Sequence, residues 1–194
     1  MRFAREAGLP LSVRGGGHHA CGFSLADAGL VVDTSDMKGI AFDGATATVV
    51  AEPGCGWRDV DRVTYQEHGL ADPGGECPTV SNAGYSLGGG FGFLSRTNGL
   101  ACDHILEAEV VGAEGNVLRV NDHEHPDLYW ALRGAGGAGL GVVTNLKYRL
   151  NRCPRRCSAR CWRGPSTTRP RRSLPTATST KDARRTGCRS ISRW

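Results

Sequence analysis

The residues best suited to chemistry form the run Arg14-Gly15-Gly16-Gly17-His18, which directly follows a short apolar segment. Three consecutive glycines allow backbone N–H groups to approach one anion closely, because no Cβ stands in the way. The run therefore predicts a loop that holds a phosphate group and carries an imidazole at its end. A plain glycine turn is the alternative.

A second group of such residues begins with Cys77 and continues into a glycine-rich stretch. Its members are Cys77-Pro78-Thr79-Val80 and Gly84-Tyr85-Ser86-Leu87-Gly88-Gly89-Gly90-Phe91-Gly92. The proline favours an extended backbone at Cys77, and the glycines supply further backbone donors. The pattern predicts a nucleophilic thiol beside a phosphate site. The alternative is that Cys77 is a small buried apolar residue.

Residues 15–20 and 134–139 both fit the glycine spacing of Rossmann dinucleotide-binding loops. The first would need a crossover helix of about ten residues before the next strand. Only residues 20–27 are available, and Gly22 interrupts them. The second follows a predicted helix and precedes a predicted strand, which reverses the required order. We therefore exclude both Rossmann assignments.

The elements that must position these residues follow from the apolar pattern. It predicts helices at 1–8, at 57–68 with Gly69 as the C-terminal cap, and at 125–132 with Trp130 on the buried side. It predicts strands at 11–14, 29–33 and 139–150, and hairpins formed by 40–43 with 45–52 and by 105–112 with 116–120. Residues 81–94 are expected to be partly helical. The order of elements indicates an α+β fold.

Charge divides the chain of 194 residues near Leu150, where the apolar pattern stops. Residues 1–150 hold 11 Lys and Arg against 18 Asp and Glu, giving −7, whereas residues 151–194 hold 13 against 1, giving +12. We expect a domain at 1–150 and a disordered or irregular basic tail at 151–194. A nucleic-acid-binding arm is the alternative for the tail.

The remaining composition excludes several classes of protein. None of the eight cysteines forms a C-x-x-C pair, so neither a zinc ribbon nor a thioredoxin-type motif is present, and we expect no metal site. No apolar stretch approaches the roughly 18 residues of a membrane span. We expect a soluble protein without membrane or nucleic-acid partners, in the cytoplasm or secreted.

Five motifs together resemble the berberine-bridge-enzyme-like flavin oxidases of the vanillyl-alcohol-oxidase superfamily. They occupy residues 14–18, 77–92, 100–106, 127–134 and 139–144, in that family's order and spacing. The resemblance implies a PCMH-type FAD-binding domain made of two small α/β subdomains, shortened at its N-terminus. It implies an oxidase that removes hydride from a C–H beside a hydroxyl or amine of a small molecule and reduces O₂.

The resemblance also implies roles for individual residues. His18 is expected to bond to the flavin 8α-methyl carbon and Cys77 to flavin C6, which makes the attachment bicovalent. Glycines 15–17 and 88–90 are expected to hold the pyrophosphate, and Gly141 and Val142 the adenine end. The cofactor-binding set is completed by Arg14, His19, Thr79, Gly84, Tyr85, Leu87 and Gly92. His104 stands where the family usually has Asn.

The chain departs from the family after Leu150. The expected substrate domain, which would supply the catalytic base, does not follow, and the tail can be back-translated and read in another frame as apolar segments. We therefore hypothesise a frameshift close to Asn151. Two functional hypotheses follow: a flavin-dependent oxidase for the family, and an inactive FAD-binding remnant for this polypeptide.

Overall fold

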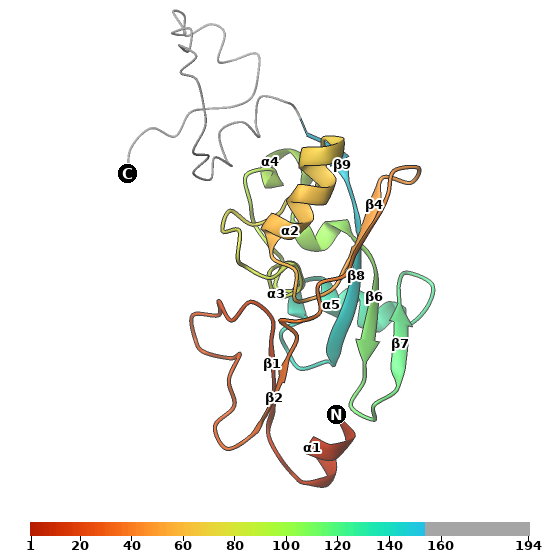
Figure 1. Cartoon of the computed structure of the whole chain (residues 1–194). Coiled ribbons are helices and arrows are strands. Elements are labelled where there is room, and N and C mark those ends of the chain that lie inside the picture. The colour runs from red at the N-terminus through yellow and green to blue at the C-terminus, as the bar shows by residue number, and fades with distance from the viewer. Residues whose placement is uncertain (154–194) are drawn as a thin grey trace, which may run out of the picture. The chain divides into compact units, whose positions relative to one another are not determined.

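The computed structural model describes residues 1–153. Within them a five-stranded antiparallel sheet carries helices on one face, and a short parallel pair of strands precedes it (Figure 1). The expectations for the basic tail beyond Cys153, including its disorder, its frameshift and the nucleic-acid alternative, lie outside the described residues.

The N-terminal part contains α1 (Arg2–Glu6), β1 (Leu11–Arg14) and β2 (Leu30–Asp33). The two strands pair in parallel, with Leu11 opposite Leu30. Residues 15–29 connect them without a helix, which agrees with the exclusion of a Rossmann unit from the sequence. The loop after β1 is fixed at its start because the carbonyl of Arg14 accepts hydrogen bonds from both the backbone N–H and the hydroxyl of Thr34, at 2.9 and 3.0 Å.

The five-stranded sheet has the order β3-β4-β8-β6-β7. Its strands are β3 (Ile40–Asp43), β4 (Thr48–Ala51), β6 (Ile105–Val111), β7 (Val117–Val120) and β8 (Val142–Arg149). Both predicted hairpins are present, since β3 pairs with β4 and β6 pairs with β7. The predicted C-terminal strand forms β8, which joins the two hairpins through β4 and β6.

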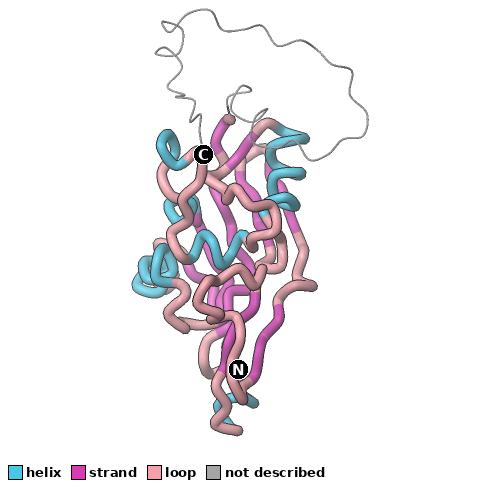
Figure 2. Tube along the Cα trace, turned by 90° about the vertical axis from the view of Figure 1, so that its left-hand side faces the viewer, coloured by secondary structure: helices cyan, strands magenta, loops and turns pink. Residues whose placement is uncertain are grey.

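The remaining elements join and cover these strands. They are α2 (Trp57–Asp61), the π-helix η1 (Arg62–Gln66), α3 (Asn82–Leu87), α4 (Ser95–Asn98), the 3-10 helix η2 (Ala101–His104), α5 (Pro126–Ala135), and the paired strands β5 (Leu70–Ala71) and β9 (Asn151–Arg152). Gly69 has the positive φ of +69° that its role after the helix predicted. Long loops occupy much of the view in Figure 2.

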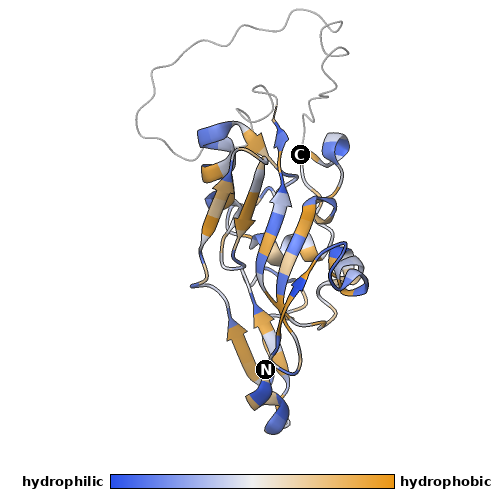
Figure 3. Cartoon of the chain, turned by 90° about the vertical axis from the view of Figure 1, so that its right-hand side faces the viewer, coloured by the Kyte–Doolittle hydropathy of each residue, from blue (hydrophilic) through white to orange (hydrophobic). Residues whose placement is uncertain are grey.

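The core lies between the sheet and α2, α3 and α5. Inward-facing strand residues such as Val49, Val110 and Leu146 are buried, and their neighbours along the strands are polar or partly exposed. The colouring of Figure 3 shows this alternation along the strands. Such a pattern is typical of an antiparallel sheet with one covered face.

Helix α3 is attached to the sheet by buried polar groups. The Tyr148 hydroxyl lies 2.9 Å from Asn82 Oδ1 and 3.2 Å from Ser86 Oγ. The Asn82 amide donates to the carbonyl oxygens of Glu52 and Cys55, at 2.8 and 3.0 Å. Because an unpaired buried amide is costly, these bonds favour one orientation of α3.

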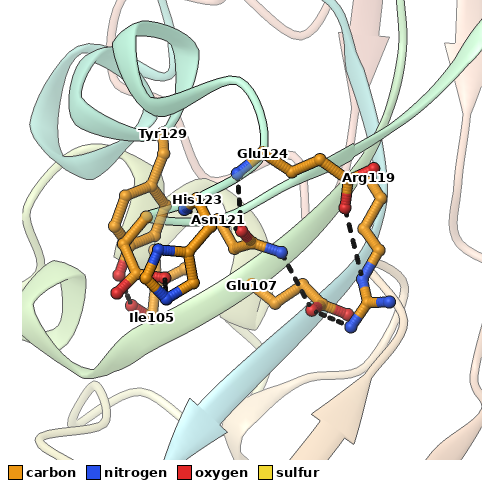
Figure 4. A network of polar contacts seen from close by, with 8 residues as sticks. Ile105, Glu107, Arg119, Asn121, His123, Glu124 and Tyr129 are labelled. Carbon is orange, nitrogen blue, oxygen red and sulfur yellow. Dashed lines mark hydrogen bonds and ion pairs between the residues drawn. The ribbon is translucent and has the colours of Figure 1, made fainter.

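The position predicted for Trp130 is wrong: its side chain is 78% exposed. Leu128, Tyr129 and Leu132 form the inward stripe of α5 instead. The Tyr129 hydroxyl donates to the carbonyl of Ile105 at 2.7 Å (Figure 4). Successive residues are about 100° apart around a helix. Because Leu128 and Leu132 face the core, Trp130 lies on the opposite side of α5.

Two carboxyl groups lie in or beside the core. Asp72 is buried, and neither of its carboxyl oxygens has a hydrogen-bond partner among the described residues. Burial, with the nearby Asp61 carboxyl adding to it, raises the pKa of Asp72 well above its ordinary value. Burial also raises the pKa of Asp61 to about 6. Folding therefore favours the protonated forms.

This arrangement predicts the effect of Asp72→Asn on stability. The ordinary Asp pKa is about 3.9, so above that pH the unfolded chain releases a proton that the folded chain retains, and stability falls as pH rises. Removing this carboxyl should raise the free energy of unfolding by on the order of 1 kcal/mol or more at pH 8.

Urea unfolding of the full chain between pH 4 and pH 8 measures the effect. The gain over the unsubstituted protein should grow with pH and approach zero near pH 4. Asp36→Asn, which changes an exposed loop carboxyl, is the matched control and should show no such trend. An equal gain at every pH would contradict the assignment.

Candidate functional site

The glycine loop after β1 packs against residues 79–81, which lead into α3. A Cβ added to Gly16 would lie 2.7 Å from the Ser81 backbone nitrogen and 3.0 Å from the Thr79 carbonyl oxygen. A Cβ on Gly15 would lie 2.9 Å from Ser81 Oγ. Ser81 cannot easily yield, because its hydroxyl donates to the carbonyl of Pro53 at 2.7 Å. Glycine is therefore required at 16 for this close approach.

The contact brings the predicted anchors His18 and Cys77 to one side chain. Thr79 Oγ1 lies 3.0 Å from His18 Nε2 and 3.4 Å from Cys77 Sγ. All three side chains are exposed. An imidazole and a thiol from segments about sixty positions apart in the sequence thus flank a single hydroxyl.

The exposure of Cys77 contradicts the alternative of a small buried apolar residue. Hydrogen bonding from the Thr79 hydroxyl, followed by that from the Thr79 backbone, lowers the pKa of the Cys77 thiol, while the charge of Glu76 acts in the opposite direction. The thiolate is the nucleophilic form of cysteine. The geometry is thus that of an accessible thiol with assisted ionisation.

The loop also presents backbone donors. Within residues 1–153, the N–H groups of Gly16 and Gly17 have no hydrogen-bond acceptor, and both residues are exposed. Gly17 has φ +69°, which a residue with a Cβ adopts at a cost. The predicted phosphate loop therefore has exposed backbone donors that no described residue accepts.

Arg14, at the end of β1, is already paired. Its guanidinium lies 3.0 Å from the Asp33 carboxylate at the end of β2. Hydrogen bonds from Ser35 lower the pKa of Asp33, and the charge of Arg14 adds to this effect. The pair is exposed and contributes little stability, but it orients Arg14 beside the loop.

The second group of glycines, which comprises Gly84 within α3 and the glycines of residues 88–92 after it, has two different kinds of position. A Cβ on Gly90 would lie 2.6 Å from the Tyr85 ring, and one on Gly92 would overlap the Gly74 carbonyl oxygen, so packing requires both glycines. Nothing lies within 4 Å of a Cβ placed on Gly84 or Gly89. Gly89 has φ +103° and needs glycine for that reason alone, whereas Gly84 lies in a helix and faces open space.

Three other predicted site residues have side chains that pack inside the domain. The Leu87 side chain is buried, and its carbonyl accepts the N–H of Gly136. Val142 is buried at the start of β8, next to Gly141 at φ +150°. Tyr85 packs edge-on against Trp57, with ring centroids 5.4 Å apart. Contact of Leu87 and Val142 with a ligand is therefore restricted to the backbone.

His19 and His104 differ in burial and in their hydrogen-bond partners. His19 is exposed, stacks on Phe23 with ring centroids 4.4 Å apart, and its Nδ1 accepts the N–H of Cys21. His104 is buried, with Nε2 2.8 Å from the carbonyl of Asn98 and Nδ1 2.9 Å from that of Arg149. His104 thus holds the end of β8 to the α4 region.

Sequence reasoning missed Ser81 and Asp33. Ser81 directly precedes α3, and a serine before a helix is a recognisable N-terminal signal, although only the tertiary contact shows that it limits the glycine loop. Asp33 ends a predicted strand, and its pairing with Arg14 depends on the parallel register of β1 and β2.

Two hollows of the described residues lie away from this site. One, of about 800 Å³, lies near η1 and β9, and another, of about 400 Å³, lies on the sheet beside the Glu107–Arg119 ion pair (Figure 4). Neither includes a predicted site residue. Residues 1–153 contain no group of three potential metal ligands, and none of their helices has the length and apolar character needed to cross a bilayer.

Comparison with known proteins identifies the family of residues 1–121. The profile of a family described as FAD binding domain matches residues 1–121. The chain is 42% identical to (R)-6-hydroxynicotine oxidase from Paenarthrobacter nicotinovorans over 160 residues, covering 82% of this chain and 34% of that protein.

Solved structures show the same similarity. Xylooligosaccharide oxidase from Myceliophthora thermophila, in complex with xylobiose, superposes with a TM-score of 0.75 at 38% identity, covering 78% of this chain and 32% of that one. BBE-like 1 from Physcomitrella patens gives a TM-score of 0.74 at 39% identity, covering 76% and 32%.

The chain spans about a third of the length of the curated relatives it matches. The family match covers well over half of the chain, and it includes both the glycine loop and the Cys77 segment. The chain therefore belongs to the FAD-binding-domain family, and its relatives include FAD-linked oxidoreductases and a berberine-bridge-enzyme-like protein.

Proposed function

We propose that residues 14–18 and 77–92 hold FAD, with His18 and Cys77 as two covalent attachment points for its ring system. The observation that carries the proposal is the shared contact of both side chains with Thr79. It supports bicovalent attachment because one ring system could reach both nucleophiles. By family resemblance, His18 would bond to the 8α-methyl carbon and Cys77 to C6.

The donor set fits a dinucleotide. The N–H groups of Gly16 and Gly17 have no acceptor among the described residues, and backbone donors in glycine loops bind phosphate oxygens. Gly88 and Gly89 are proposed to add contacts at the other end of α3. Because this helix has six residues, its ends lie about 9 Å apart, so the two loops belong to one neighbourhood.

Bound FAD would supply the redox chemistry by accepting a hydride and passing electrons to O₂. The residues of this chain would bind the phosphates, hold the ring and keep it from dissociating. Two covalent bonds also change the electronic properties of the ring, which is one of the ways in which a protein adjusts a cofactor.

We propose that the whole protein is a flavin-dependent oxidase acting on a small molecule. Relatives include a xylooligosaccharide oxidase and an (R)-6-hydroxynicotine oxidase, so both sugar hydroxyls and amines are candidate substrate groups. The catalytic base is proposed to lie outside residues 1–153.

Substitution of the anchors tests the attachment. His18→Ala and Cys77→Ala should each remove one bond, so each single variant should still retain flavin after acid precipitation. The double variant should release its flavin into the supernatant. Absorbance of the acid-precipitated protein and mass spectrometry of tryptic peptides measure the linkage.

His123→Ala is the matched control, because this histidine is exposed, belongs to no predicted site and should keep both bonds. Colourless protein from a preparation supplied with FAD would contradict FAD binding. Unchanged flavin peptides in both single variants would contradict the anchors while leaving FAD binding intact.

Gly84→Ala tests the role of the open face of α3. Alanine is favoured over glycine in a helix by roughly 0.5–1 kcal/mol, and the added Cβ meets nothing within 4 Å. The flavin-free protein should therefore be slightly more stable, whereas FAD content should fall several-fold because the methyl group would occupy ligand space.

Gly137→Ala is the control for this variant. Gly137 also faces open space but is no predicted site residue. Its variant should keep the FAD content of the unsubstituted protein, as measured by the ratio of flavin absorbance to protein absorbance. Full FAD content in Gly84→Ala would remove Gly84 from the site.

A further inference from the structure

One hydroxyl lies between the two groups proposed to carry the flavin. His18 follows the glycine loop, Cys77 and Thr79 precede α3, and Thr79 Oγ1 is 3.0 Å from the imidazole nitrogen and 3.4 Å from the sulfur. We propose that Thr79 is a positioning residue that couples the two groups, accepting a hydrogen bond from His18 Nε2 and donating one to the Cys77 thiolate.

The valence of the hydroxyl limits the possible arrangements. A threonine hydroxyl has one hydrogen and can also accept, whereas a thiolate only accepts. If the hydrogen points to sulfur, Nε2 of His18 must carry a hydrogen to complete the second bond. In the opposite arrangement a Cys77 thiol donates to Thr79, and Thr79 donates to a bare Nε2.

Passage from the second arrangement to the first transfers one proton. The sulfur gives its proton to the Thr79 oxygen, and the Thr79 hydrogen passes to Nε2, so that a thiol and a neutral imidazole become a thiolate and an imidazolium. Threonine is unchanged, and charge is conserved. Ionisation of Cys77 is thereby linked through Thr79 to the presence of a hydrogen on His18 Nε2.

The surroundings support the direction of this transfer. Hydrogen bonds from Thr79 lower the pKa of Cys77, whereas the carboxylate of Glu76 on the same segment opposes the change. Thr79 is exposed, so its hydroxyl is not needed to satisfy a buried partner. Its side chain can therefore be changed with little effect on core packing.

The inference rests on the proposed roles of His18 and Cys77, but it can be tested without flavin. The full chain, prepared free of flavin, is alkylated with iodoacetamide between pH 5 and pH 10, and peptide mapping by mass spectrometry gives the rate at Cys77. Exposed Cys21 in the same sample is the internal reference.

Thr79→Val keeps the shape of the side chain and removes the hydroxyl. Alkylation of Cys77 should become about three- to tenfold slower at pH 7, with its pH profile shifted upward, because the thiolate loses a hydrogen-bond donor. Thr79→Ser should retain the original pH profile. Thr79→Ala also removes the hydroxyl and should give the same slowing as Thr79→Val, which shows that the effect does not come from the shape of valine.

His18→Ala provides the test of coupling. It should also slow alkylation of Cys77, and the effect of Thr79→Val should be smaller in that background than alone. Thr97→Val is the matched control, because the exposed Thr97 hydroxyl donates to the Leu94 carbonyl and its loss should leave Cys77 unchanged.

An unchanged Cys77 profile in both Thr79→Val and Thr79→Ala would overturn the inference, as would fully additive effects of Thr79→Val and His18→Ala. These results are independent of flavin attachment. If the Thr79 and His18 variants slow alkylation of Cys77 but Cys77 forms no flavin bond, only the proposed attachment is contradicted. If Cys77 carries flavin but its alkylation does not depend on Thr79, only the coupling is contradicted.

Discussion

The close approach of Gly16 to Ser81 is the constraint on which the site depends. With any larger residue, a Cβ would lie 2.7 Å from a backbone nitrogen, and the loop after β1 would have to withdraw from the segment before α3. His18 would then lose Thr79, and the imidazole and the thiol would no longer share a partner. The glycine loop thus serves two purposes, since the absence of side chains permits both this packing and the exposure of its N–H groups.

Helix α3 connects the sheet to this contact. Its inner face is held by Tyr148 of β8 through Asn82 and Ser86, and its outer face carries Gly84. Buried hydrogen bonds are directional, whereas apolar contacts tolerate rotation and sliding. A polar attachment in the core therefore positions α3 more specifically than apolar packing alone would.

The segment that leads to Cys77 includes several unfavourable features. Asp72 is buried without a hydrogen-bond partner among the described residues, and so is the Trp57 indole N–H. Gly74 and Gly75 pass so close to the Trp57 ring that a Cβ on either would lie within 3 Å of it. Departures from good local structure are expected near functional sites, and here Asp72, Gly74 and Gly75 precede the proposed nucleophile by a few residues.

The sequence by itself determined the class of fold, both hairpins, the main strands and the identity of the motifs, because these depend on periodicity and on local glycine and proline chemistry. Tertiary structure alone decided that His18 and Cys77 meet at Thr79, that Arg14 pairs with Asp33, and that the Leu87 side chain belongs to the core. It also placed Trp130 on the exposed side of α5 and not on the predicted buried side. The reason is physical: periodicity reports which stripe of an element is apolar, whereas contacts between distant segments depend on register and helix phase, which only the packed chain fixes.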